Sequence, residues 1–335
     1  MKKTLAAIAA IAAIAASCSK SEVAYEATGE IGFIPVTENM TKTMMTGSTF
    51  QTSENFNLWA YYKPVAASTS AEDWLSDVSD HQIYINEKPF THREGTSWGG
   101  VTPYFWPKTG SLVFVGYYPT TIENNVEHDL TTNTMTFSNI PQSRVAESGY
   151  DEDIMYFNLT PSYATNSVAA EFKHALSWIS VLLVKSDTTP DDATITVNKV
   201  EFTNVLPSGD ATVVGSNDIA WTPKGTAATV EILEGTDVEL AKNNTTVQAY
   251  EPLFIPQTMA GNLVVTYTIS STDESEFQEV HTTKLSDMTD SESNELEAWE
   301  AGKHYTYTIT IGTEEILVAP TVKEWDEVEI DLPIQ

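Results

Sequence analysis

The sequence contains one cysteine, few basic residues and, after its N-terminal region, no apolar run of membrane length. The single cysteine, Cys18, excludes an intramolecular disulfide. Lysine and arginine number 17 against 47 acidic residues, which gives a net charge of −30. Such a charge repels nucleic acid and anionic lipid, so we expect neither as a partner. The hydrophobic fraction of 41% is typical of a folded globular chain.

Sequence motifs for catalysis are also missing. The chain lacks the zinc-protease, nucleophile-elbow, phosphate-loop and paired-cysteine patterns. The histidines are scattered: His81, His92, His128, His174, His281 and His304. The acidic clusters lack the alternating ligands and glycine turn of a calcium loop. We expect no enzyme activity, cofactor or metal, although loop carboxylates that converge from distant positions stay an open alternative.

The N-terminus is typical of an export signal. Two lysines precede an uncharged apolar run, Leu5 to Ala16, which is shorter than the ~20 helical residues that span a bilayer. Small residues then lead directly into Cys18, whose thiol can receive a lipid. We predict a lipoprotein signal peptide over residues 1–17 and an acylated Cys18 that holds the chain on the outer membrane, exposed at the cell surface. An ordinary secretory signal with a chance cysteine is the alternative.

The remaining chain has the period of two that β-strands show. Alternating or β-branched runs occur at 83–86, 112–118, 198–202, 229–233, 263–269 and 305–311, separated by glycine, proline, asparagine and aspartate turns. Helical periodicity is restricted to residues 71–78. We predict an all-β protein with one domain over 18–168 and a second over 169–335, divided just before the longest apolar stretch.

Six segments, taken together and in order, carry a resemblance. They are Phe56–Tyr62, Trp98 with Pro103–Pro107 and Leu112–Pro119, Asp151–Tyr156, Phe172–Ser177, Pro252–Thr258 and Trp299–Tyr307. Behind a lipoprotein signal, this set resembles the fimbrillin family of Bacteroides-type bacteria, which are pilus subunits made as lipoprotein precursors. The resemblance implies two transthyretin-like β-sandwich domains in tandem. It also implies assembly by strand exchange, in which a protease removes the first strand and a neighbouring subunit fills the groove.

The two ends of the chain can be compared with that mechanism. Residues 23–42 supply a removable first strand, in which Tyr25, Ala27, Ile31 and Phe33 share one parity. The family commonly has arginine at the cleavage site, whereas Lys42 is the only basic residue between 38 and 50. Lys42 is therefore the candidate cleavage site, and an uncut strand, as in an anchor, is the alternative.

The C-terminal residues 326–335 form a candidate donor strand. Its apolar residues alternate, with acidic residues between the first three: Val328, Ile330, Leu332 and Ile334. Alternate apolar side chains can fill the pockets of a groove while the backbone pairs with its edges. Pro333 lacks an N–H, so pairing should weaken there. An ordinary last strand of the second domain is an equal alternative.

The sequence thus predicts a structural and adhesive subunit of a fimbrium. Its partners would be other pilus subunits, the same or related, and a host or bacterial surface ligand stays open. A second hypothesis is a surface lipoprotein that binds glycans without polymerising, through the aromatic residues Trp98, Tyr104, Phe105, Trp106, Tyr117 and Tyr118. These residues are also consistent with core packing, which we favour. A hydrolase ranks last.

Overall fold

The structure is a computed structural model of the chain. It describes residues 29–37, 50, 52–64, 81–95, 97–142, 152–159, 168–215, 217–233, 237–242, 245–247, 251–271, 276–291, 293–313 and 316–325. The protein is all-β, as the sequence predicts: strands and turns make up the described chain apart from two short 3₁₀ helices, η1 (Thr120–Asn125) and η2 (Leu285–Asp287). Within these ranges, no helix has the length and apolar character needed to cross a bilayer.

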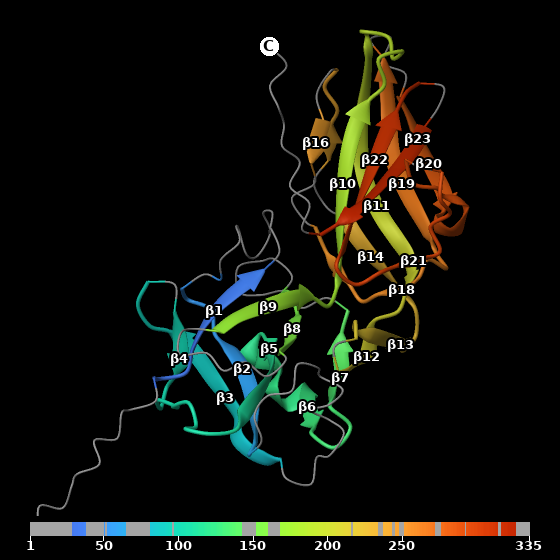
Figure 1. Cartoon of the computed structure of the whole chain (residues 1–335). Helices are drawn as coiled ribbons and strands as arrows, with labels where there is room; N and C mark the ends of the chain where they lie inside the picture. Colours follow the sequence, from blue (N-terminus) through green and yellow to red (C-terminus); the bar gives the residue numbers. More distant parts are fainter. Residues whose placement is uncertain are drawn as a thin grey trace, which may run out of the picture.

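The N-terminal part is a closed barrel of seven strands (Figure 1). In sheet order they are β1 (Gly32–Thr37), β4 (Trp98–Gly100), β3 (Gln82–His92), β2 (Phe56–Lys63), β5 (Ser111–Tyr118), β8 (Met155–Leu159) and β9 (Val168–His174). β1 and β9 run parallel and complete the circle, whereas the other pairs are antiparallel.

The C-terminal part contains two sheets that enclose a common core (Figure 1). The first has the order β16 (Thr245–Val247), β10 (Ser177–Lys185), β22 (Lys303–Ile311), β23 (Ile316–Glu324), with β17 (Leu253–Phe254) also paired to β10. The second has the order β14 (Ala228–Leu233), β11 (Ala193–Val205), β19 (Asn262–Ser271), β20 (Glu276–Lys284), with β15 (Val238–Glu239) also paired to β11.

A four-stranded sheet joins the two parts. Its order is β13 (Ala220–Lys224), β12 (Ser208–Val214), β7 (Thr134–Pro141) and β6 (Val126–Asp129), so a hairpin from the second half of the chain pairs with strands from the first. A small sheet of β18 (Gln257–Thr258) and β21 (Ala298–Trp299) completes the structure. The predicted division between residues 168 and 169 stays a prediction; β9 pairs with the barrel and β10 with the C-terminal sheets.

The buried side chains explain how the joining sheet is held. All of β5 is buried, because alternate residues face opposite cores. Phe114 faces the barrel interior, whereas Val115 and Tyr117 pack outward against Phe137 and Val213 of the joining sheet. The barrel wall therefore has an apolar layer on both faces, which accounts for a continuous apolar sequence where a one-sided sheet would alternate.

The strands predicted from alternation are confirmed: 83–86 lies in β3, 112–118 in β5, 198–202 in β11, 229–233 in β14, 263–269 in β19 and 305–311 in β22. The long apolar stretch after residue 170 forms two strands, β9 and β10, separated by Ala175 and Leu176. The predicted helical turns at 71–78 lie outside the described residues.

Candidate assembly site

The first strand, β1, closes the barrel between β9 and β4. It pairs in parallel with β9 over five residue pairs that begin with Phe33 and Val168. On its other side it pairs with β4 at two positions. Just before the strand, the Ile31 N–H donates to the Tyr104 carbonyl oxygen at 2.7 Å. Removal of β1 would leave the facing edges of β9 and β4 without their partner, and unpaired edges readily accept another strand.

The side chain of Phe33 fills the centre of the barrel. It is fully buried, and its ring lies 5.1 Å from that of Phe114 and 5.3 Å from that of Phe90, both edge to face. The rings of Phe56 and Phe157 are also within 6.2 Å. Edge-to-face pairs of this kind add about 0.5–1.5 kcal/mol beyond simple burial. Phe33 is therefore the main apolar anchor of β1.

The alternation predicted for this strand is confirmed where it is described. Ile31 and Phe33 are fully buried and Pro35 is also buried, whereas Ile34 is 37% exposed. Burial of one large apolar side chain stabilises a fold by roughly 1.5–3 kcal/mol, so these two anchors contribute about 3–6 kcal/mol. A cut in the chain after β1 would by itself leave the strand bound. Its release needs a replacement that fills the same space.

The far end of β9 carries a buried histidine that contacts a buried carboxyl group. His174 Nδ1 lies 2.6 Å from Asp153 Oδ2, and each side chain is 1% exposed. The Ala175 N–H donates to the Ile154 carbonyl oxygen at 2.8 Å, which fixes the two segments side by side. His174 is thus a structural histidine with a satisfied partner, as its apolar surroundings predict. Sequence reasoning missed Asp153 as that partner, although both lie in segments that carry the resemblance.

Trp325, the last described residue, is fixed against this pair. Its ring stacks on that of His174 at 4.1 Å with an interplanar angle of 5°. Its backbone N–H donates to the Gly302 carbonyl oxygen at 2.8 Å. These contacts set the point from which the chain continues into residues 326–335. A cleft of about 710 Å³ begins here and extends along β8 and β9, lined among others by Lys173 and Glu324.

A second polar cluster resembles a hydrolytic triad in composition only. Ser180 Oγ lies 2.7 Å from His304 Nε2 and 2.5 Å from Glu251 Oε1. A hydroxyl has one proton, so when Ser180 donates to the carboxylate it must accept from the histidine N–H. In a triad the histidine nitrogen accepts the serine proton, and the carboxylate contacts the other ring nitrogen. His304 also stacks on Trp178 at 3.6 Å, which indicates a packing role.

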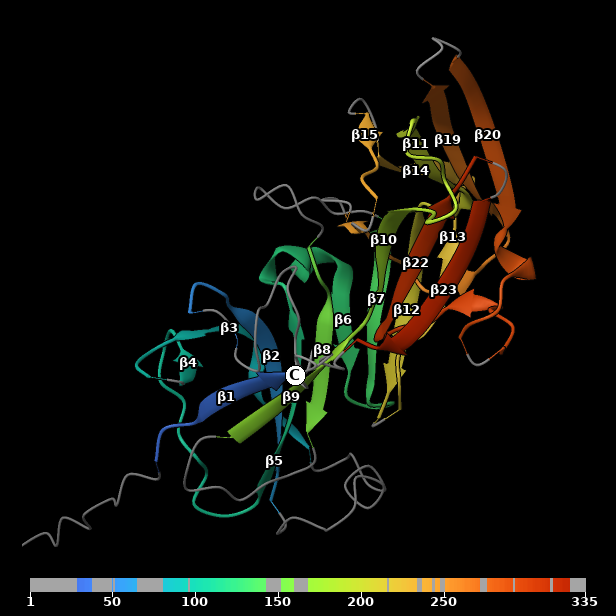
Figure 2. The same cartoon turned by 90° about the horizontal axis from the view of Figure 1, so that it is seen from above.

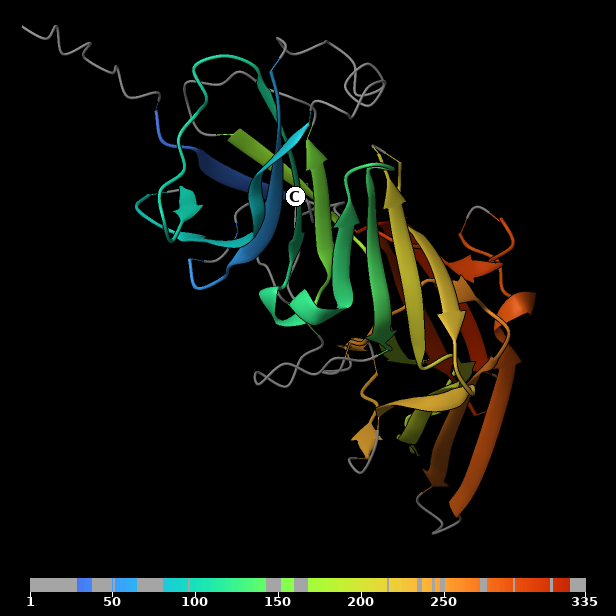
Figure 3. The same cartoon turned by 90° about the horizontal axis from the view of Figure 1, so that it is seen from below.

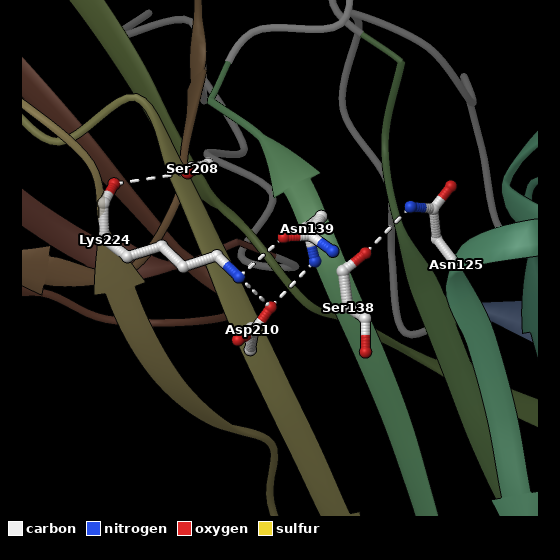
Figure 4. Close-up of polar contacts among 6 residues, drawn as sticks. All are labelled: Asn125, Ser138, Asn139, Ser208, Asp210 and Lys224. Atoms are coloured by element: carbon white, nitrogen blue, oxygen red, sulfur yellow. Dashed lines mark hydrogen bonds and ion pairs between the residues drawn. The ribbon is translucent and has the colours of Figure 1, made fainter.

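The sheet that joins the two parts contains its own polar network (Figure 4). Asn139 has a positive φ of 54°, next to a register shift between β7 and β12. Asp210 Oδ1 accepts from the Asn139 N–H at 2.7 Å and from Lys224 Nζ at 2.6 Å. These donors lower the pKa of Asp210, the Asn139 N–H most strongly. The carboxylate thus satisfies a backbone donor beside the register shift.

The same network continues to both sides. Lys224 Nζ also donates to Asn139 Oδ1 at 2.7 Å, and Ser208 Oγ donates to the Lys224 carbonyl oxygen at 3.2 Å. On the side of the barrel, Asn125 Nδ2 donates to the Ser138 carbonyl oxygen at 2.8 Å (Figure 4). The network therefore connects residues more than 80 positions apart and supports the joining sheet at the register shift between β7 and β12.

His128 lies against the outer wall of the barrel. Its Nδ1 is 2.7 Å from the Tyr61 hydroxyl, and its Nε2 is 3.2 Å from Asn133 Oδ1. Asn133 accepts through that oxygen, so Nε2 carries the proton and Nδ1 accepts from the tyrosine. Burial lowers the pKa of His128 to about 4. The ring is therefore neutral at physiological pH.

The predicted site residues are placed as follows. Cys18, Lys42 and the donor-strand residues Val328, Ile330, Leu332 and Ile334 lie outside the described residues, so their roles stay predictions. Among the aromatic residues proposed for glycans, Trp98, Trp106, Tyr117 and Tyr118 are buried, and Phe105 is 46% exposed. Most of this group belongs to the core, the reading that the surrounding prolines favour. Within the described ranges, no three histidine or carboxylate side chains converge on one point.

Comparison with known proteins finds one family match and several structural matches. A family model described as "Fimbrillin-like" matches residues 41–325. No curated protein matches this sequence. The crystal structure of a fimbrial protein from Bacteroides vulgatus aligns with a TM-score of 0.60 and 18% identity, covering 88% of this chain and 99% of that one.

Two candidate cell adhesion proteins also align at TM-scores of 0.52. The protein from Bacteroides uniformis has 17% identity and covers 89% of this chain and 99% of its own. The protein from Bacteroides ovatus has 13% identity, with 90% and 99% covered. At such identities the likeness shows a shared fold.

Proposed function

The chain belongs to the fimbrillin-like family, and from this premise we propose that it is a structural and adhesive pilus subunit that assembles by β-strand exchange. The family match and the fimbrial and adhesion proteins among its structural neighbours support a pilus-type adhesive subunit at the cell surface. The finer proposal includes two transthyretin-like sandwich domains in tandem, a lipid on Cys18 that attaches the precursor to the outer membrane, and removal of the first strand.

The position of β1 carries the proposal. This strand is near the N-terminus, and it lies between β9 and β4, whose facing edges it pairs with. Cleavage after Lys42 would separate β1 from the rest of the chain while noncovalent contacts still held it. Because Ile31 and Phe33 stabilise it by several kcal/mol, an incoming strand must compete for the same pockets. Strand exchange fits this requirement better than simple dissociation.

The candidate donor has matching chemistry. Four apolar side chains would lie along one face of this segment: Val328, Ile330, Leu332 and Ile334. In β1, Ile31 and Phe33 likewise share one buried face. Pro333 does not exclude this segment as a donor, because β1 itself contains a buried proline without an N–H, Pro35. Leucine or isoleucine is smaller than the phenyl ring of Phe33, so the exchanged barrel must close partly around the donor.

Mass spectrometry of surface-exposed protein tests the cleavage step. A peptide that begins at Thr43 is the expected product of a protease that accepts lysine. A Lys42→Gln variant should lose that peptide and should not enter fibres. An intact, acylated Cys18 peptide from assembled fibres would contradict the cleavage and would place this subunit as an anchor or terminal unit.

Deletion of residues 328–335 tests the donor separately. We expect the variant to fold with unchanged stability and to stop polymerising. A loss of stability in the monomer would instead show an ordinary last strand of the C-terminal part, and the proposed donor would then be wrong.

A further inference from the structure

The edge strand β20 differs from the other sheet edges of the described chain. It pairs with β19 on one side, over nine consecutive residue pairs without a register shift. Figures 2 and 3 show it at the outer margin of the C-terminal sheets, away from the barrel. Seven of its nine residues are exposed. A long, regular and exposed edge presents unpaired N–H and C=O groups that can bind another strand.

The other edges carry the usual protection against pairing. β23 contains Pro320 and β13 contains Pro223, and a proline removes a backbone donor. β14 has register shifts in its pairing, and β6 and β16 have four and three residues. β20 has no proline, and its one lysine, Lys284, is at its last position. Its exposed edge is the best suited for intermolecular pairing.

Apolar exposure coincides with this edge. Phe277 and Val280 are each 62% exposed, on opposite faces of the strand. Phe277, Glu279 and His281 line a cleft of about 610 Å³ between the two C-terminal sheets, beside Ile316. Sheet strands normally bury the residues on such an inner face, so this part of the sheet lacks a covering element among the described residues.

The sequence of β20 is complementary to itself. We propose that β20 pairs antiparallel with β20 of a second copy of this chain, about a two-fold axis through Val280. In this register Glu276 lies opposite Lys284, and Glu279 lies opposite His281 of the second copy. Val280 lies opposite its own copy, and Phe277 lies opposite Thr283. Each oppositely charged or polar pair occurs twice, as a two-fold axis requires.

Charge supports a second copy over other occupants. The chain has a net charge of −30, so two copies generally repel each other. β20 carries two glutamates, one lysine and one histidine, and in the self-paired register each Glu276 lies opposite a lysine and each Glu279 opposite a histidine rather than opposite a carboxylate. The C-terminal residues 326–335 are acidic at Glu329 and Asp331 and contain no basic residue, so they offer the glutamates of β20 no partner of opposite sign, which disfavours that occupant. The pairing goes beyond the proposed pilus function, because it uses an edge distant from β1.

Disulfide trapping tests the register directly. In the chain without residues 1–18, a Val280→Cys variant has a single thiol, and the two thiols of a dimer would face each other across the axis. Directly opposed Cβ atoms lie about 4.5–5.5 Å apart in an antiparallel pair, close to disulfide geometry. We expect rapid formation of a covalent dimer under mild oxidation.

The matched control is Phe277→Cys, which has the same exposure on the same strand. In the proposed register its thiol is opposite Thr283 and roughly 20 Å from its own copy, at ~3.4 Å per residue. This variant should cross-link much more slowly. Equal rates for the two variants would show random collision and would overturn the proposal.

Charge exchange measures the same pairing without a cysteine. By sedimentation velocity at about 100 μM, a range suited to a small interface, we expect the unmodified chain to form dimers. Glu276→Lys should weaken the dimer about tenfold, since two attractive pairs become repulsive. Glu276→Lys with Lys284→Glu should restore it to within about twofold, because the same pairs re-form with reversed sign.

Two further outcomes decide against the proposal. A monomer at all concentrations would overturn it, as would a double variant as weak as the single one. Deletion of residues 326–335 should leave the dimer unchanged. Loss of the dimer on that deletion would show that the C-terminal segment is the occupant and would contradict β20 self-pairing.

Discussion

The change Phe33→Ala tests whether β1 is held in the barrel by one aromatic anchor. Phe33 is fully buried and packs against four phenylalanine rings. Replacing a buried phenylalanine by alanine typically costs 3–5 kcal/mol, and the rings around it are fixed by the barrel strands. We expect a loss of about 4 kcal/mol in the free energy of unfolding of the barrel. Urea unfolding followed by tryptophan fluorescence measures it.

The matched control is Ile34→Ala, the next residue on the same strand. Its side chain is 37% exposed, so we expect a loss below about 1 kcal/mol. Hydrogen exchange should show faster opening of β1 and of the facing edge of β9 in the Phe33 variant alone. Equal effects of the two changes, or a loss below about 1.5 kcal/mol for Phe33→Ala, would refute the view that this ring anchors the strand.

Two other positions give direct tests of the fold. The pKa of His128 is about 4 in the folded chain and near 6.5 in the unfolded chain. Between these two values the unfolded chain binds more protons than the folded chain. The free energy of unfolding should therefore fall by up to about 3 kcal/mol as the pH drops from 6.5 to 4. A His128→Gln variant should lose less over this range in urea titrations, and an unchanged slope would contradict the assignment. A Cβ on Gly261 would lie 1.7 Å from the Thr203 carbonyl oxygen, whereas one on Gly95 would meet nothing within 4 Å. Gly261→Ala should therefore lower the melting temperature strongly and Gly95→Ala less. Similar melting temperatures for the two variants would contradict the close approach of Gly261 to Thr203.

Much of the fold could be predicted from the sequence, because strand periodicity is local. The run Tyr305–Ile311 alternates buried and half-buried residues, and the structure places it in β22 with that pattern. The apolar run in β5 does not alternate, since the joining sheet covers its outer face. No local pattern shows that covering sheet, because it pairs β7 with β12 from the other half of the chain.

The candidate site was predictable only in part. The parity of Ile31 and Phe33 identifies the buried face of the first strand, and the structure confirms it. The neighbours of that strand depend on long-range closure of the barrel, which brings residues 33 and 168 together. The contact between His174 and Trp325 is likewise tertiary, because it joins the end of β9 to the end of β23. Spacing in the sequence does not indicate either contact.

Binding of the C-terminal peptide is the most direct test of strand exchange. A fluorescent peptide of residues 326–335 would be titrated against the chain that starts at Thr43 and against the chain that starts at Ser19, which keeps β1. We expect binding to the first chain and little or none to the second. A variant peptide with Leu332→Asp should bind more weakly to the first chain. Equal binding to both chains, or no binding to either, would contradict assembly through the groove that β1 occupies.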